Sequence, residues 1–246
     1  MRISRVLIDH WPEADALLVI RGEPSHYLRQ VLRLRKGFLV TLFDGQGLEC
    51  EAAIEAFGRD ETHLRLLGTP EAVSRESPLE IHLTLGISRS ERMDLAIQKA
   101  VELGVRKISP IFTEFGVVRL DEEKKITRHQ HWRRIIQSAC EQCGQNRLPT
   151  LSPPESFEAV IERQAPAETR LLIDPTGTNG FRGLPRPEGP LQLLIGPEGG
   201  FSKKETERAQ QQGWCTVALG PRILRTETAV IATMAAVQTL WGDLGG

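Results

Sequence analysis

From residue 81 to the end of the chain, short apolar runs alternate with segments typical of helices. The apolar runs lie at 81–87, 107–112, 170–174, 191–195 and 214–219, and the helical segments at 90–103, 131–142, 157–164, 203–212 and 228–241. Strands separated by helices run parallel, because a parallel neighbour needs a long crossover connection. The alternation therefore predicts an α/β domain over 81–246, with a mainly parallel sheet covered by helices on both faces.

Residues 1–70 have a different pattern. Two runs typical of strands flank Asp44-Gly45, which is a hairpin signal, and another lies at 62–68. Ser25 can cap a helical segment at 26–37, and Gly37 can end it. We predict a small β-rich, barrel-like domain over 1–70. A linker follows at 71–80, where proline, serine and charged residues replace the apolar pattern.

Charge, hydropathy and cysteine content narrow the class of protein. The net charge is −1, so RNA binding would have to rest on a local basic patch. The chain has no apolar run long enough to span a bilayer and no signal peptide at its start, so we expect a soluble, cytoplasmic protein. Its 4 cysteines are expected to be free thiols. Cys140 and Cys143 lack a second pair for a four-thiolate zinc site, and no metal is predicted.

Two glycine-containing turns follow predicted strands. "GPEGG" (196–200) comes after the run at 191–195, and "LGPRILRTETA" (219–229) comes at the end of the run at 214–219. The carboxyl ends of parallel strands are where open α/β sheets bind ligands. Neither turn is a phosphate-binding loop, and Glu198 would repel a polyphosphate. Glu198 suits hydroxyls, an amine or a positive charge, all of which S-adenosylmethionine offers.

These motifs resemble those of the bacterial 16S ribosomal RNA uridine N3-methyltransferase family, a branch of the SPOUT class. "ERMDLAIQKAVELGV" (91–105) and "ACEQCGQNRLP" (139–149) are similar to its catalytic domain. "MRISR", "VLRLRKG" and "LFDG" resemble its amino-terminal RNA-binding domain, and the similarity covers nearly the whole chain. Phe115 and Gln145 depart from the family, in which arginine is common at both positions.

The resemblance implies a SPOUT-type parallel sheet with a carboxy-terminal trefoil knot, a small amino-terminal PUA-like β-barrel, and a homodimer. The apolar last helix could serve the core, a dimer contact or both. S-adenosylmethionine is the implied cofactor. Matching motif positions place it against Asp174, Pro175, Ile195, Gly196, Glu198, Gly199, Gly200, Leu219, Gly220, Ile223, Leu224, Thr226 and Ala229.

Methylation at N3 requires the uracil imide to lose a proton. We hypothesise that Arg225 stabilises the negative charge that grows on the uracil carbonyl oxygens. Glu227 or Glu198 would accept the proton, directly or through water. The alternative for Arg225 and Glu227 is an exposed ion pair at a helix start.

The implied partner is 16S ribosomal RNA within the assembled small ribosomal subunit. Arg29, Arg33 and Lys36 are spaced to lie on one face of the predicted helix at 26–37, where they could contact phosphates. Arg2, Arg5 and Arg147 are further candidates for RNA binding.

Three other functions stay open at this point. One is ribose 2′-O-methylation by a related knotted enzyme, and another is RNA binding without catalysis. The third is a haloacid-dehalogenase-type phosphatase, because "LLIDPTGT" (171–178) resembles its nucleophile motif with Asp174 as the nucleophile. That class also needs a downstream acidic pair for magnesium, and Asp243 is the only aspartate after Asp174.

Overall fold

The computed structural model describes residues 4–13, 16–163 and 169–245. They form two compact units, and each contains two stretches of the chain. The first unit comprises Met1–Glu76 and Cys140–Leu148, and the second comprises Ser77–Ala139 and Pro149–Gly246. The predicted division at 71–80 therefore falls near the observed one. The sequence placed 140–148 in the second domain, and here the structure differs.

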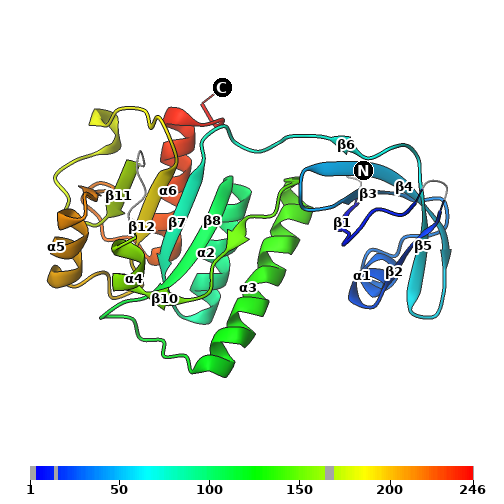
Figure 1. Ribbon diagram of the computed structural model, residues 1–246, viewed down its shortest axis with the longest axis horizontal. Helices are drawn as coiled ribbons and strands as arrows, with labels where there is room; N and C mark the ends of the chain where they lie inside the picture. The colour runs from blue at the N-terminus through cyan, green and yellow to red at the C-terminus, as the bar shows by residue number, and fades with distance from the viewer. Residues whose placement is uncertain (1–3, 14–15, 164–168, 246) are drawn as a thin grey trace. The chain divides into compact units, whose positions relative to one another are not determined.

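The first unit is built on a curled sheet that forms a half-barrel (Figure 1). Its strands are β1 (Ser4–Leu7), β2 (Leu18–Arg21), β3 (Leu39–Phe43), β4 (Leu48–Phe57), β5 (Glu61–Leu66) and β6 (Glu71–Ala72). The order is β1-β3-β4-β5-β2, and β6 pairs with β4. β1 is parallel to β3, whereas the other pairs are antiparallel. The hairpin predicted at Asp44-Gly45 is confirmed as the β3–β4 connection.

The helix predicted at 26–37 is shorter than expected. α1 (Glu23–His26) continues as the π-helix η1 (Tyr27–Val31) and ends there. Arg33 has φ 53°, in the left-handed region, and the Leu34 N–H donates to the Leu28 carbonyl at 3.0 Å. A residue in the left-handed region followed by a hydrogen bond back into the last turn ends a helix. Leu28 is fully buried and Leu34 packs against the same core cluster, so burial ends the helix before Lys36.

The second unit contains a 7-stranded sheet in which every pairing is parallel. Its strands are β7 (Ile81–Gly86), β8 (Val105–Phe112), β9 (Thr150–Leu151), β10 (Glu155–Ser156), β11 (Thr169–Ile173), β12 (Leu191–Ile195) and β13 (Cys215–Val217). The order is β10-β8-β7-β12-β11-β13, and β9 pairs with β8. The predicted parallel α/β sheet is confirmed.

Helices cover this sheet on both faces, as the alternation predicts (Figure 1). They are α2 (Ser90–Glu102), α3 (Glu122–Cys143), α4 (Phe157–Ile161), α5 (Lys203–Gln211) and α6 (Thr226–Trp241). α2 and α6 pack against each other on one side. On the other, Phe157 of α4 and Ala209 of α5 join a core cluster with Leu194 of β12. Among the helices in the described part of the chain, none is long and apolar enough to cross a membrane.

Candidate functional site

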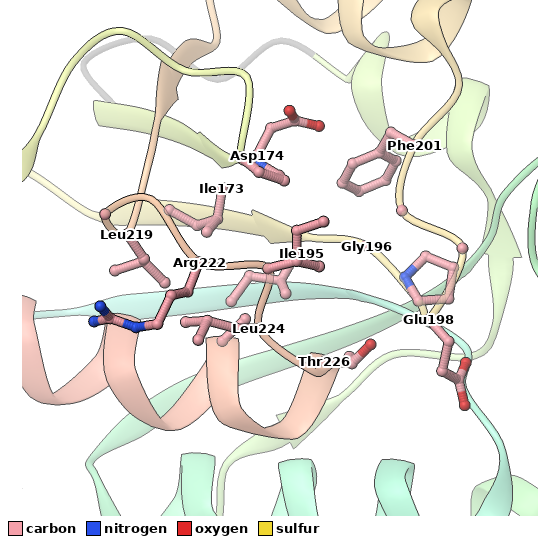
Figure 2. A pocket seen from close by; sticks show the side chains of 17 residues that line it. Ile173, Asp174, Ile195, Gly196, Glu198, Phe201, Leu219, Arg222, Leu224 and Thr226 are labelled. Atoms are coloured by element: carbon pink, nitrogen blue, oxygen red, sulfur yellow. The ribbon is translucent and has the colours of Figure 1, made fainter.

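Three neighbouring strands of the second unit end at the same level. Ile173 is the last residue of β11 and pairs with Ile195, the last residue of β12. On its other side, Ile173 pairs with Val217, the last residue of β13. The turns that follow these strands therefore leave the sheet side by side, although they are far apart in the sequence. Parallel register brings the two glycine motifs together, as Figure 2 shows.

A cavity of about 360 Å³ lies between these turns. Every residue that the resemblance assigned to the cofactor lines it: Asp174, Pro175, Ile195, Gly196, Glu198, Gly199, Gly200, Leu219, Gly220, Ile223, Leu224, Thr226 and Ala229. Pro197 and Arg222, which lie inside the two glycine motifs, also line it, and so do Ile173 and Phe201, which lie just outside the predicted segments. Sequence reasoning missed Ile173 and Phe201, and extending the predicted segments by one residue would have found both.

Close packing of the backbone explains why two positions around this cavity are occupied by glycine. A Cβ on Gly86, at the end of β7, would lie 2.3 Å from Pro197 Cδ. A Cβ on Gly199 would lie 2.8 Å from Phe115 Cβ. Both distances are far shorter than real contacts, so a side chain at either position would displace the "GPEGG" turn. The turn is thus held against β7 on one side and the segment after β8 on the other.

Glu198 connects this turn to the start of α2. Its Oε1 accepts a hydrogen bond from the Arg89 N–H at 3.1 Å and lies 3.3 Å from Arg92 Nη1. Partial burial raises the pKa of Glu198. Hydrogen bonds from the backbone N–H groups of Glu198 and Arg89 outweigh this, so the pKa lies below its ordinary value. The carboxylate is therefore an anion near neutral pH.

Several buried polar atoms at the site have no partner within the protein. Glu198 Oε2 and Thr226 Oγ1 are buried without a hydrogen bond, and both residues line the cavity. A buried polar atom left unpaired costs about 1–3 kcal/mol, so such atoms mark places where a ligand can bind. A ligand that offers N–H or O–H groups and a positive charge fits this cavity. Arg222 and Glu198 lie at its opposite ends (Figure 2).

The structure separates the predicted catalytic residues. Glu198 lines the cavity, whereas Arg225 and Glu227 do not, although they flank the lining residue Thr226. Arg225 is exposed and is the N-cap residue of α6. Glu227 lies in the first turn of α6, and its Oε2 is buried without a partner. The described residues show no ion pair between Arg225 and Glu227, which was the alternative for this pair.

The predicted basic face in the first unit is not a helical face. Arg29 lies in η1 and donates to the Gly58 carbonyl at 2.9 Å. Arg33 and Lys36 come after the helix ends, so the spacing that placed the three residues on one face does not apply. All three side chains are exposed, as is Arg147. Arg2 lies outside the described residues.

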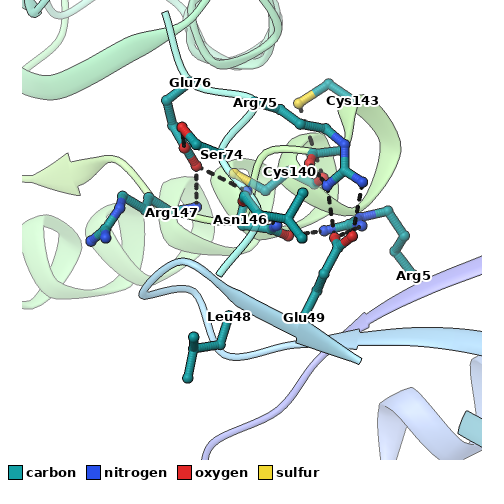
Figure 3. Close-up of polar contacts among 12 residues, drawn as sticks. Arg5, Leu48, Glu49, Ser74, Arg75, Glu76, Cys140, Cys143, Asn146 and Arg147 are labelled. Carbon is teal, nitrogen blue, oxygen red and sulfur yellow. Dashed lines mark hydrogen bonds and ion pairs between the residues drawn. The ribbon is translucent and has the colours of Figure 1, made fainter. Parts of the chain in front are cut away.

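The structure corrects the prediction that Arg5 binds RNA. Its guanidinium donates to Glu49 at 2.8 Å and to the Asn146 side chain, and it lies 4.7 Å from the centre of the Phe43 ring (Figure 3). The Arg5 side chain is only 9% exposed. A buried, paired guanidinium cannot contact a phosphate without breaking this network. Its role is to hold the segment 140–148 against the sheet of the first unit.

The same network explains why 140–148 belongs to the first unit. Arg75 also pairs with Glu49, at 2.7 Å, and Glu76 Oε1 accepts the backbone N–H groups of Asn146 and Arg147 (Figure 3). Hydrogen bonds from Arg75 lower the pKa of Glu49 to about 2, against an opposing effect of burial and with a further contribution from Arg5.

Cys140 and Cys143 lie beside this network and, among the described residues, form no group that could hold a metal ion. Burial raises the pKa of the Cys140 thiol, with the Cys143 thiol as a further cause, so Cys140 stays protonated. Throughout the part of the chain that the structure describes, no three His, Cys, Asp or Glu side chains are grouped to hold a metal ion.

Comparison with known proteins matches both units. An RNA methyltransferase domain family matches residues 75–238, and an RNA methyltransferase PUA domain family matches residues 20–67. A relative named ribosomal RNA small subunit methyltransferase E, from Buchnera aphidicola subsp. Schizaphis graminum, is 36% identical. The match covers 99% of this chain and 98% of the relative.

Two solved structures with bound S-adenosylmethionine are also similar. Ribosomal RNA small subunit methyltransferase E from Neisseria gonorrhoeae has a TM-score of 0.91 at 33% identity, covering 99% of this chain and 100% of that one. A methyltransferase from Legionella pneumophila has a TM-score of 0.94 at 38% identity, with the same coverage of 99% and 100%. These likenesses extend over both units, so they bear on the whole chain.

Proposed function

The chain belongs to the ribosomal RNA small subunit methyltransferase E family, and from this premise we propose that it methylates N3 of a uridine in 16S ribosomal RNA. S-adenosylmethionine is the proposed methyl donor, as in the similar structures that contain it. The observation that carries the proposal is the single cavity formed by both glycine motifs. The resemblance to a phosphatase motif at Asp174 falls away, since the whole chain matches methyltransferases.

The residues of the cavity suit the proposed donor. The glycine turns allow backbone groups to approach a flat ring, and Glu198 offers an anionic oxygen that lacks a partner. Thr226 Oγ1, also unpaired, can exchange a hydrogen bond with a ribose hydroxyl or an amine. When bound, S-adenosylmethionine supplies an electrophilic methyl group on its sulfonium sulfur.

The chain's own part in the reaction is to position the base and remove its N3 proton. Holding two reactants in line can contribute up to about 7–11 kcal/mol of the barrier. Glu198 and Glu227 are the candidate proton acceptors, because each has a buried Oε2 without a donor. Glu198 lies in the cavity wall but is a weak base, because its pKa is lowered. Arg225, beside Thr226, is the candidate for stabilising the charge on the uracil oxygens.

We also propose how the substrate is held. The exposed side chains of Arg29, Arg33, Lys36 and Arg147 are candidates for phosphate contacts in RNA. The target uridine must be unpaired or pulled from its stack, so that N3 is accessible. The assembled small subunit in the cytoplasm is the proposed substrate.

A homodimer with the trefoil knot of the SPOUT class completes the proposal. The support for the dimer is the partly exposed apolar surface of α6, where Ile231, Ala235 and Ala236 are half-buried and Leu240 is 45% exposed. Small residues on this face permit close approach of a second copy.

The test offers labelled S-adenosylmethionine and unmodified small ribosomal subunits to the purified protein. We expect label in 16S ribosomal RNA and a reverse-transcription stop at one uridine, because a methyl group at N3 blocks the pairing face. A ribose methyl group would not stop the polymerase in the same way and would indicate 2′-O-methylation. RNA binding without any methyl product would indicate a protein that has lost catalysis.

The same assay tests the catalytic assignments. We expect Arg225→Ala and Glu227→Gln to lower turnover while the affinity for S-adenosylmethionine is kept. If both variants turn over at a near-normal rate, the assignment of these two residues is wrong.

A further inference from the structure

A second cavity, which we name the arginine pocket, lies at the carboxyl end of β7. Its volume is about 180 Å³, half that of the cavity between the glycine motifs. Ile87, Met93, Val118, Leu120 and Trp132 supply its apolar walls. Sites for complete small molecules usually exceed about 300 Å³, so this pocket suits a single ring.

The rest of the lining is polar and positively charged. It consists of Ser88, Arg89 and Ser90 at the start of α2, and Arg128 of α3. Among the described residues, neither Arg89 nor Arg128 has a hydrogen bond or ion pair through its guanidinium. Unpaired arginines beside an apolar wall provide donors for a flat ligand with oxygen acceptors.

Trp132 is an aromatic part of the wall of the arginine pocket. The residue is 1% exposed and lines the arginine pocket, and its Nε1 is buried without a hydrogen bond. Among nucleobases, uracil places a carbonyl acceptor on each side of N3. Cytosine replaces one of these acceptors with an amino group, which the arginines would repel.

Glu198 lies between the two cavities. It lines the larger one, and its Oε1 accepts the N–H of Arg89, which lines the arginine pocket. The segment after β8 also reaches both, because Phe115 lies against Gly199 while Val118 and Leu120 line the arginine pocket. A ring in the arginine pocket is therefore adjacent to the proposed methyl-donor cavity.

We propose that the arginine pocket receives the target uracil and that Arg89 and Arg128 stabilise negative charge on its carbonyl oxygens. This inference rests on the proposed function. The N3–H bond breaks with its electron pair left on the imide, and the proton goes to the carboxylate of Glu198. N3 then forms its new bond to the methyl carbon, while the carbon–sulfur pair stays on sulfur. Because Glu198 is a weak base, the imide must be made more acidic, which two guanidinium groups accomplish.

Other charged groups stand around the pocket and enter the design of the experiment. Arg92 pairs with Glu198, and Arg119 is exposed on the segment after β8. His131 Nε2, on α3, lies 2.8 Å from Asp94 Oδ2, on α2. Arg133, also on α3, is exposed and does not line the pocket, so it provides a matched control.

The experiment compares wild type, Arg128→Met, Arg128→Lys and Arg133→Met. Single-turnover methyl transfer to unmodified small subunits is measured across pH, and donor affinity is measured by calorimetry. We expect Arg128→Met to lower the rate about 100-fold, as for loss of one oxyanion donor. The rise of its rate with pH should move to higher pH, with donor affinity unchanged. Arg128→Lys should restore part of the rate and part of the wild-type pH dependence. Arg133→Met should match wild type in rate and in pH dependence.

A second variant, Val118→Trp, fills the pocket from an exposed segment. We expect it to abolish methyl transfer while S-adenosylmethionine still binds. The inference is overturned if Val118→Trp remains active, or if Arg128→Met keeps the wild-type rate or loses rate equally at every pH. Failure of the proposed function is distinct, because the wild type itself would then place no methyl group on N3.

Discussion

Glu198 should stabilise the second unit measurably, because it caps α2 from a distant loop. The N-cap residue of α2, Arg89, has no side-chain hydrogen bond of its own. Glu198 Oε1 accepts the N–H of Arg89 instead, and it also pairs with Arg92. Replacing Glu198 by alanine removes this cap, the negative charge at the start of α2 and the ion pair. Replacing it by glutamine keeps an acceptor oxygen and removes the charge.

The expected loss follows from these contributions. A cap is worth about 1 kcal/mol and a negative charge at a helix start about 0.5 kcal/mol. The ion pair adds about 0.5 kcal/mol, since its side chains are 35% and 17% exposed. Glu198→Ala should therefore lower the free energy of unfolding by about 2 kcal/mol, and Glu198→Gln by about 1 kcal/mol. For a chain of this size, these values correspond to Tm shifts of about 4–8 °C and 2–4 °C.

Differential scanning calorimetry at several pH values checks this prediction. The pKa of Glu198 is lower in the folded protein than its ordinary 4.5, so its charge stabilises the fold above that value. This stabilisation is lost as the pH falls through the folded pKa, and wild type and Glu198→Gln should then converge. Glu207→Gln is the control, because Glu207 forms an exposed pair with Lys203 at 3.7 Å. Equal Tm values for wild type and Glu198→Ala at pH 7 would refute the reasoning.

Three further predictions concern other positions. Gly86→Ala should weaken S-adenosylmethionine binding at least about tenfold, as measured by calorimetry, because its Cβ would meet Pro197 Cδ at 2.3 Å. The control Gly180→Ala should bind S-adenosylmethionine normally, because the space around Gly180 is open. The pKa of Glu49 is about 2 in the folded protein, against an ordinary value of 4.5, so its charge stabilises the fold above pH 4.5 by at most about 3 kcal/mol. This stabilisation is lost as the pH falls towards 2. Acid titrations followed by circular dichroism should therefore show a smaller loss of stability over this range in Glu49→Gln. Ser202→Ala should cost about 1 kcal/mol in chemical denaturation, because it breaks the capping box of α5, and an unchanged midpoint would contradict this.

Local patterns in the sequence were sufficient for most of the second unit. Strand and helix periodicity predicted its parallel sheet, and the Ser202–Glu205 capping box at the start of α5 is confirmed. Gly104 ends α2 with φ 81°, as expected for a residue that leaves a helix in the left-handed region. Each of these features depends on residues close together in the chain. Hydrophobic spacing and caps therefore determine them before the strands assemble.

The candidate cofactor residues came from the resemblance to a known family, and the sheet explains why they line one cavity. They lie in contiguous motifs at strand ends, and parallel pairing of Ile173, Ile195 and Val217 brings the ends together. A motif read as a continuous segment thus identifies the cavity wall. Arg225 and Glu227, which were predicted as catalytic residues, flank the lining residue Thr226 but do not line the cavity, because successive side chains at the start of α6 point in different directions.

Local patterns specify most of the elements and the class of the second unit, and the motifs that resemble a known family specify the segments that form its cavity. Contacts between distant parts of the chain bury Arg5 against Glu49 and Asn146 and place 140–148 in the first unit. Burial of Leu28 in the core also ends the helix at Val31. The arginine pocket likewise forms only where α2, α3 and the segment after β8 come together. The physical reason is distance along the chain. Periodicity and capping act over one or two turns, whereas burial and charge pairing join residues that no local pattern relates.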